Sequence, residues 1–139
     1  MGFQPLVAMT EETLECSALT ALAEQATAEI LVPNKISALE ADLSAQNCGT
    51  AITQRGRREI HCRWSFDYRA EAAIAFQDHV ASRLRECLSA VDVAPEQGVN
   101  HPDTYDQQQF RADDLGASLS RKDKAAINAT LIFLRVGGV

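Results

Sequence analysis

The segment from Arg57 to Val91 constrains the fold most, because its hydrophobic period changes from two residues to a helical repeat with no intervening Gly or Pro. From Ile60 to Tyr68 apolar and polar residues alternate strictly, as in a strand with one buried face. Asp67 is the expected N-cap of the helix that follows. Strand face and helix stripe must each be buried, so we expect them to pack on each other. The apolar residues at helical spacing are Ala73, Phe76, Val80, Leu84, Cys87, Leu88 and Val91.

Two helices are expected before this segment. The first begins at the N-cap Thr10 and runs through an Ala-, Leu- and Glu-rich stretch to about Leu31, before Pro33. A shorter helix is predicted from Ile36 to Gln46. Residues 1–9 are expected to form a loose lead-in to the first helix.

A hairpin is expected before the long helix and a loop after it. Thr50 to Gln54 is a short β-type run, which Arg55-Gly56-Arg57 can turn back into the Ile60–Tyr68 strand. Asp92 to Gln107 contains two prolines, a glycine and several acids, which is typical of a loop.

The C-terminal part of the chain predicts three further strands. Gln108 to Ala112 and Leu115 to Ser120 flank Asp113-Asp114 as a second hairpin. Arg121-Lys122-Asp123-Lys124 follows as a charged connector. Ala129 to Val136 is apolar on both faces, so we place it in the middle of the sheet and expect both of its faces to be covered.

Together these patterns predict one α+β domain over residues 1–139. The element order is α(α)-ββ-α-βββ, with an antiparallel or mixed sheet of four to five strands and helices packed on it. The long helix covers one face, and the first helix or a second subunit could cover the other. The expected core consists of Trp64, Phe66, Phe76, Leu84, Ile132 and Leu134.

The four cysteines leave alternatives open. There is no C-x-x-C motif, which argues against thioredoxin-like and zinc-ribbon sites. The thiols are either reduced and mostly buried, or joined in two disulfides, with a metal site as a third alternative. If disulfides form, Cys48 and Cys62 should pair, because they flank the hairpin centred near Arg55. Cys16 would then pair with Cys87.

Two groups of polar residues are candidate sites. Arg55, Arg57 and Arg58 are either a solvated hairpin tip or a contact for an anion or an acidic partner. In the loop before residue 108, the chemistry-bearing residues are His101, Asp103, Tyr105 and Asp106. Imidazole, carboxylate and phenol groups can perform acid–base chemistry or bind a metal, but Asn, Pro and Asp also build ordinary turns.

Charge and missing motifs exclude several classes of function. A net charge of −6 argues against nucleic-acid binding, since phosphates would be repelled over most of the surface. No apolar run approaches the roughly 18–20 residues that span a bilayer. Motifs for dinucleotides, nucleoside triphosphates, zinc or calcium are lacking, so neither a cofactor nor a metal is predicted.

A small non-enzymatic protein-binding or interaction domain is therefore favoured over an enzyme, with a protein partner or self-association, for example as a dimer. The alternative is a small enzyme or ligand-binding protein that uses the His101–Asp106 loop. In size, acidity and mixture of helix with antiparallel sheet the chain resembles small secretion chaperones of type III systems, but its strand-rich C-terminus departs from their terminal helix. Reduced cysteines would indicate the cytoplasm, and disulfides with a removed signal peptide the periplasm or secretion.

Overall fold

The computed structural model describes residues 14–28, 33–52, 58–93 and 105–138. The predicted lead-in of residues 1–9 lies outside these ranges. The helices are α2 (Cys16–Thr27), α3 (Pro33–Asp42) and α4 (Glu71–Leu88), with a short 3-10 turn η1 (Ala125–Ile127). The strands are β1 (Asn47–Ile52), β2 (Arg58–Asp67), β3 (Val91–Val93), β4 (Tyr105–Ala112), β5 (Leu115–Lys124) and β6 (Ala129–Gly138).

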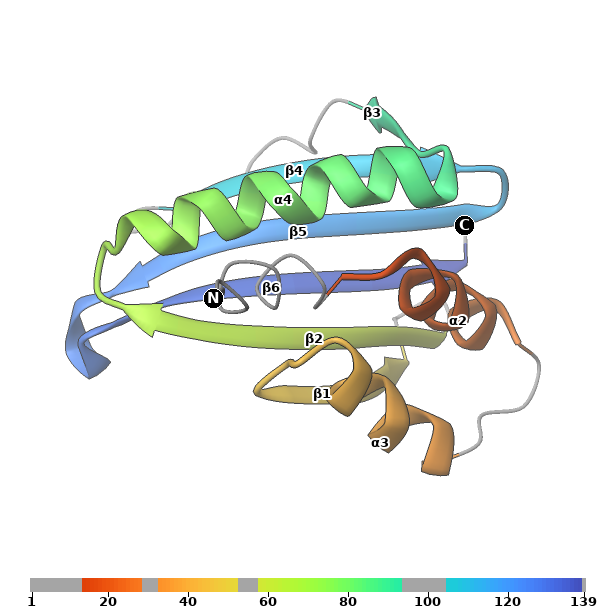
Figure 1. Cartoon of the computed structure of the whole chain (residues 1–139), viewed down its shortest axis with the longest axis horizontal. Helices are drawn as coiled ribbons and strands as arrows, with labels where there is room; N and C mark the ends of the chain where they lie inside the picture. The colour runs from red at the N-terminus through yellow and green to blue at the C-terminus, as the bar shows by residue number, and fades with distance from the viewer. Residues whose placement is uncertain (1–13, 29–32, 53–57, 94–104, 139) are drawn as a thin grey trace, which may run out of the picture.

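The six described strands form one antiparallel sheet in the order β1-β2-β6-β5-β4-β3 (Figure 1). The α+β class is confirmed, but the predicted four to five strands were too few, and the sheet is not mixed. The extra strand is β3, which begins at Val91, predicted as the last residue of the helical stripe, and continues into the predicted loop. It pairs with the end of β4. Three residues with a central Asp are too short to show an alternating pattern, so the sequence did not indicate it.

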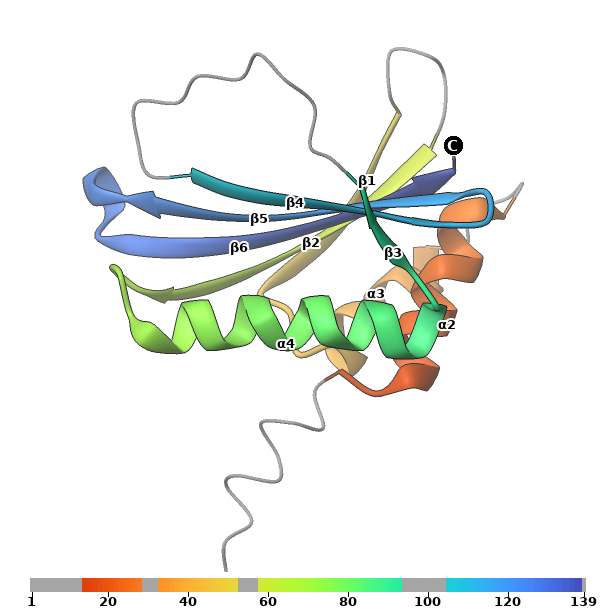
Figure 2. The same cartoon turned by 90° about the horizontal axis from the view of Figure 1, so that it is seen from above.

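β6 occupies the centre of the sheet, between β2 and β5, as its apolar sequence predicted. The first helix does not cover the second face of β6, as one alternative predicted, because α2 packs on the same side of the sheet as α4. Cover by a second subunit stays a prediction. Ile132 and Leu134 are buried on the side of the helices, whereas on the other side Leu131 is buried, Phe133 is half-buried and Arg135 is exposed. All three described helices lie on one side of the sheet (Figure 2). We call the other side the open face.

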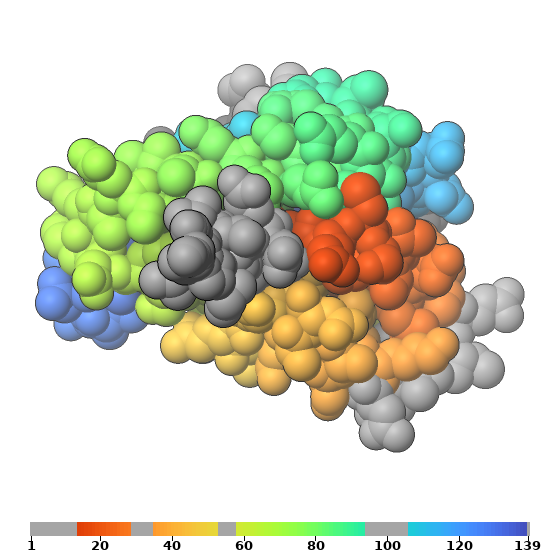
Figure 3. All heavy atoms as spheres, viewed as in Figure 1, coloured from red at the N-terminus to blue at the C-terminus, as the bar shows by residue number. Residues whose placement is uncertain are grey.

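Helices α4, α2 and α3 lie over one side of the sheet (Figure 3). Helix α4 runs along the sheet, α2 packs against α4, β2 and β6, and α3 packs against β1. The predicted core is formed here: Trp64, Leu84, Ile132 and Leu134 are buried, and Phe66 and Phe76 are half-buried against them. The ring centroids of Trp64 and Phe76 are 5.0 Å apart.

Helix α4 begins later than predicted, and its N-cap is Ala70 rather than Asp67. The backbone carbonyl of Asp67 accepts a hydrogen bond from the Ala70 N–H, which forms a turn between β2 and the helix. Arg69 in this turn has a φ of 57°. The chain therefore needs one tight turn after the strand before helical geometry can begin, which the uninterrupted sequence pattern concealed.

The charged residues Arg121 to Lys124 were predicted to form a connector, and this was wrong. They form the last part of β5. Their side chains alternate between the two faces of the sheet. Arg121 donates a hydrogen bond to Gln77 of α4, and Asp123 accepts one from Thr130, so both are paired on the helix side. Lys122 and Lys124 belong to the open face. Pairing with β4 and β6 and these polar contacts let a charged sequence form a strand.

The sulfur atoms of both predicted cysteine pairs lie at disulfide distance. Cys16 and Cys87 join the start of α2 to the end of α4 with a Cα–Cα distance of 5.1 Å. Cys48 and Cys62 are directly opposite each other on β1 and β2, with a Cα–Cα distance of 4.1 Å. Within the described ranges no helix is long and apolar enough to cross a membrane.

The outer edge of the sheet at β1 carries a side-chain contact from α3. The carboxylate of Glu40 accepts a hydrogen bond from the backbone N–H of Cys48, with a nitrogen–oxygen distance of 2.8 Å. This amide is therefore directed away from β2 and bound by a charged group. Further along the same strand, Ile52 is 76% exposed.

An ion pair between Arg85 and Asp92 fastens β3 to the end of α4. Arg85 donates two hydrogen bonds to the carboxylate, of 2.8 and 2.9 Å, and these lower the pKa of Asp92. Because the folded-state pKa lies below the unfolded-state value, the pair stabilises the fold above the unfolded-state pKa. That stabilisation is lost as the pH falls through the folded-state pKa.

We expect Arg85→Gln to raise the pKa of Asp92 toward its ordinary value, as measured by NMR of the carboxyl carbon during acid titration. The change in stability should be small, because both side chains are largely exposed. Arg83→Gln is the matched control, since Arg83 pairs with Glu86 and should leave Asp92 unaffected. An unchanged Asp92 titration in Arg85→Gln would contradict this assignment.

Candidate functional site

The two candidate sites from the sequence are described only in part. Arg55, Arg57, His101 and Asp103 lie outside the described residues. Arg58 donates a hydrogen bond to the backbone carbonyl of Ala28, so it connects β2 with the end of α2.

Tyr105 and Asp106, the described residues of the loop candidate, are the first two residues of β4. The carboxylate of Asp106 accepts a hydrogen bond of 2.9 Å from buried Gln77 of α4 and lies 3.9 Å from Arg121. Gln77 also donates to Gln108 and accepts from Arg121. Asp106 is therefore part of a network of hydrogen bonds between α4 and the sheet. This network holds α4 in place on β4 and β5.

The open face of the sheet concentrates basic residues in a chain whose net charge is −6. Strand register assigns every second residue of each strand to this face. Among the described strand residues on it, the acids are Glu59 and Asp67, near the two ends of β2. The basic residues are Arg63, Arg111, Lys122, Lys124 and Arg135, together with His61.

The basic residues of the open face differ from the other described arginines in whether they form ion pairs with carboxylates. The ion pairs among described residues join Arg69 to Asp123, Arg83 to Glu86, Arg85 to Asp92 and Arg121 to Asp106. By contrast, within the described ranges no ion pair or side-chain hydrogen bond involves Lys122, Lys124 or Arg135. The Nε atom of Arg63 is buried and has no hydrogen-bond partner in the described part of the chain. The open face therefore presents positive charge that the described chain does not neutralise.

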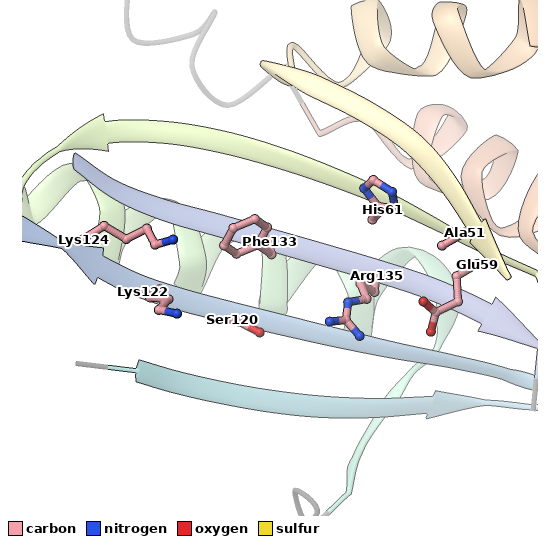
Figure 4. A pocket seen from close by; sticks show the side chains of 8 residues that line it. All are labelled: Ala51, Glu59, His61, Ser120, Lys122, Lys124, Phe133 and Arg135. Carbon is pink, nitrogen blue, oxygen red and sulfur yellow. The ribbon is translucent and has the colours of Figure 1, made fainter. Parts of the chain in front are cut away.

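A shallow hollow of about 580 Å³ lies in the middle of this face (Figure 4). β5 contributes Ser120, Lys122 and Lys124, and β6 contributes Phe133 and Arg135. The half-buried ring of Phe133 is the apolar part of the floor. Glu59 and His61 of β2 and Ala51 of β1 line the end of the hollow near Arg135.

Two glycines make room for side chains at that end. A Cβ atom on Gly49 would lie 3.0 Å from the imidazole of His61, so this glycine lets the ring lie over β1. A Cβ atom on Gly137 would lie 3.2 Å from the Cγ of Glu59. Glu59 therefore lies over β6, in the position after Arg135 along the same face.

The hollow combines cationic side chains with an aromatic ring. Its cations can hold carboxylate or phosphate groups, and Phe133 can contact an apolar group beside them. Within the described residues, no three His, Cys, Asp or Glu side chains cluster so that they could hold a metal ion.

One pattern in the sequence indicates this site, but it was missed because residues 121–124 were interpreted as a charged connector and not as part of a strand. Lys122 and Lys124 are separated by Asp123 and follow Arg121, and successive side chains of a strand point to opposite faces. Extending the strand through Lys124 would have placed both lysines on the same face. Their proximity to Phe133 and Arg135 depends on the register of β5 against β6, which the sequence does not reveal.

Comparison of the sequence with protein-family models and with curated proteins finds no match. The interpretation of the open face therefore depends on its own residues. Their charge, burial and register are the observations from which function is inferred.

Proposed function

We propose that the chain is a small non-enzymatic interaction domain that binds an acidic segment of a partner protein on the open face of its sheet. The observation that carries this proposal is the contrast in pairing. Arg69, Arg83, Arg85 and Arg121 have carboxylate partners, whereas Lys122, Lys124 and Arg135 have none among described residues. Charges of one sign on a surface attract a partner of the opposite sign and orient it.

Charge also decides between a partner protein and a second copy of the chain. If two open faces packed on each other about a twofold axis, the lysines and arginines of one copy would meet those of the other. Like charges brought together in an interface are unfavourable, so a symmetric dimer through this face is disfavoured. An acidic segment supplies the missing carboxylates directly.

A nucleic acid is a less suitable partner than an acidic protein segment. The chain carries 19 acidic and 13 basic residues, so most of its surface repels a polyphosphate. The hollow itself contains the carboxylate of Glu59. A short acidic segment needs to contact only the few cations of the open face and can avoid the rest of the surface.

The cysteine pairs support a working location in an oxidising compartment. Disulfides persist in the periplasm and outside the cell and are rare in the cytosol. With both pairs at bonding distance, we place the protein in the periplasm or among secreted proteins.

The test uses a fluorescent oligoglutamate peptide titrated with the protein at low and at physiological salt. We expect saturable binding that weakens with salt, because exposed charges are screened. Lys122→Glu should weaken it roughly three- to tenfold, since one attraction becomes a repulsion. Arg135→Glu should have a similar effect.

Lys35→Glu is the matched control, because it makes the same change of charge at an exposed position of α3. Equal weakening by Lys35→Glu and Lys122→Glu would show that only net charge matters and would refute the assignment to the open face. Submicromolar binding of single-stranded RNA or DNA at physiological salt would refute the proposal that the partner is an acidic protein segment.

A further inference from the structure

Three cations of the open face, Lys124, Lys122 and Arg135, form a regular series along β5 and β6. Lys124 is paired with Ala129, Lys122 with Leu131 and Ser120 with Phe133, while Arg135 is the next β6 residue on the same face. The lining side chains follow one another in the order Lys124, Lys122, Phe133, Arg135 and Glu59 (Figure 4). Successive members differ by two residues in register along the strand axis, which corresponds to about 6.6 Å, and the series moves to the neighbouring strand after Lys122 and again after Arg135.

An extended peptide has the same spacing as this series. Its side chains at every second position point to one side and are also separated by about 6.6 Å. A segment aligned within about 30° of β6, as in packed sheets, would therefore stay in step with the series. Its backbone N–H and C=O groups would point sideways into water, so none would be buried without a partner.

A helix fits the series less well. Side chains on one helix face recur every three to four residues, at about 4.5–6 Å along the axis. Three such steps are about 2–6 Å shorter than the distance along the strand axis from Lys124 to Arg135. A helical partner could reach one or two of the cations but would not remain in register with all of them.

We propose that the open face recognises an extended acidic segment with the pattern acid–x–acid–x–apolar–x–acid. This inference rests on the proposed function and adds the alignment of the acidic segment with the residues of the open face. The three acids face Lys124, Lys122 and Arg135, and the apolar residue contacts the ring of Phe133. Glu59 follows Arg135 along the same face and repels an acid at the next alternate position, which fixes where the acidic pattern ends.

The experiment compares two peptides of identical composition and charge, each about seven residues long to match Ala129–Arg135. One has glutamates at positions 1, 3 and 7, leucine at 5 and serines elsewhere. The other has three consecutive glutamates with leucine at one end. We expect the alternating peptide to bind the wild-type protein about tenfold more tightly, because only it can satisfy the three cations and Phe133 together.

A second comparison tests the apolar position. Replacing leucine by serine in the alternating peptide should weaken binding to the wild type but not to Phe133→Thr, a variant in which the β-branched threonine suits the central strand. Thermal unfolding of the variant checks that the sheet is retained. The comparison of the two isomers on the wild-type protein needs no variant.

The outcomes separate the two proposals. Equal affinity for both isomers, with loss of binding in Lys122→Glu, would overturn the register while leaving the acidic-partner function intact. Failure of every acidic peptide to bind would overturn both. So would a dimer of the wild-type protein, detected by sedimentation, that Lys122→Glu dissociates, because the face would then bind a second copy.

Discussion

Trp64→Ala is expected to lower the free energy of unfolding by about 3–5 kcal/mol. Trp64 is 6% exposed, packs against Phe76, and donates a hydrogen bond of 3.1 Å from its indole nitrogen to the carbonyl of Leu43. Alanine removes the buried ring, leaves a cavity and deprives that carbonyl of its donor. The loss can be measured by denaturant unfolding followed by circular dichroism.

Ile127→Ala provides the control, because Ile127 is 60% exposed and its truncation should change stability by only about 0.5 kcal/mol. Native Trp64 fluorescence should be blue-shifted and poorly quenched by iodide. Red-shifted emission that iodide quenches readily would contradict the burial of Trp64, and with it the assignment of the helix-facing side of β2.

Removal of the Cys16–Cys87 link is the second change with a large expected effect. The two residues are 71 positions apart, so the link closes a long loop in the unfolded chain. In the chain-entropy model a loop of this length stabilises by about 4 kcal/mol. Replacing both cysteines by alanine should lower the free energy of unfolding by that amount, in protein folded under oxidising conditions.

The Cys48–Cys62 pair is the internal comparison, because its separation is only 14 residues. Its removal should cost about 3 kcal/mol in the same model. Thiol counting of unfolded, non-reduced protein should find no free thiol, and a peptide map should show both links. Four free thiols in protein isolated from an oxidising compartment would refute the disulfides and the proposed location.

The sequence predicted those parts of the fold that depend on patterns within one segment. The alternation in β2 and the helical stripe of α4 identify their buried faces, and the doubly apolar β6 marks the centre of the sheet. Pairing of Cys48 with Cys62 follows from the hairpin geometry of β1 and β2. These features are local or need a single turn, so periodicity is sufficient to find them.

The features that the sequence did not predict depend on contacts between distant segments. β3 is held by pairing with β4 and by the bond between Arg85 and Asp92, neither of which leaves a periodic pattern. The hollow on the open face combines residues of four strands, and Phe133 meets Ser120 only through the register of β5 against β6. The same apolar residues that placed β6 centrally also suggested a second covering layer, although Arg135 interrupts that face.

The contact between Glu40 and the Cys48 amide has a consequence for solubility. An edge strand with unpaired backbone groups invites foreign strands and can start aggregation. On β1 the first outward amide is already bound by a carboxylate from α3, so an incoming strand would have to displace a charged group before it could pair along the whole edge. The same short helix that extends the core thus makes the pairing of a foreign strand with the start of β1 less favourable.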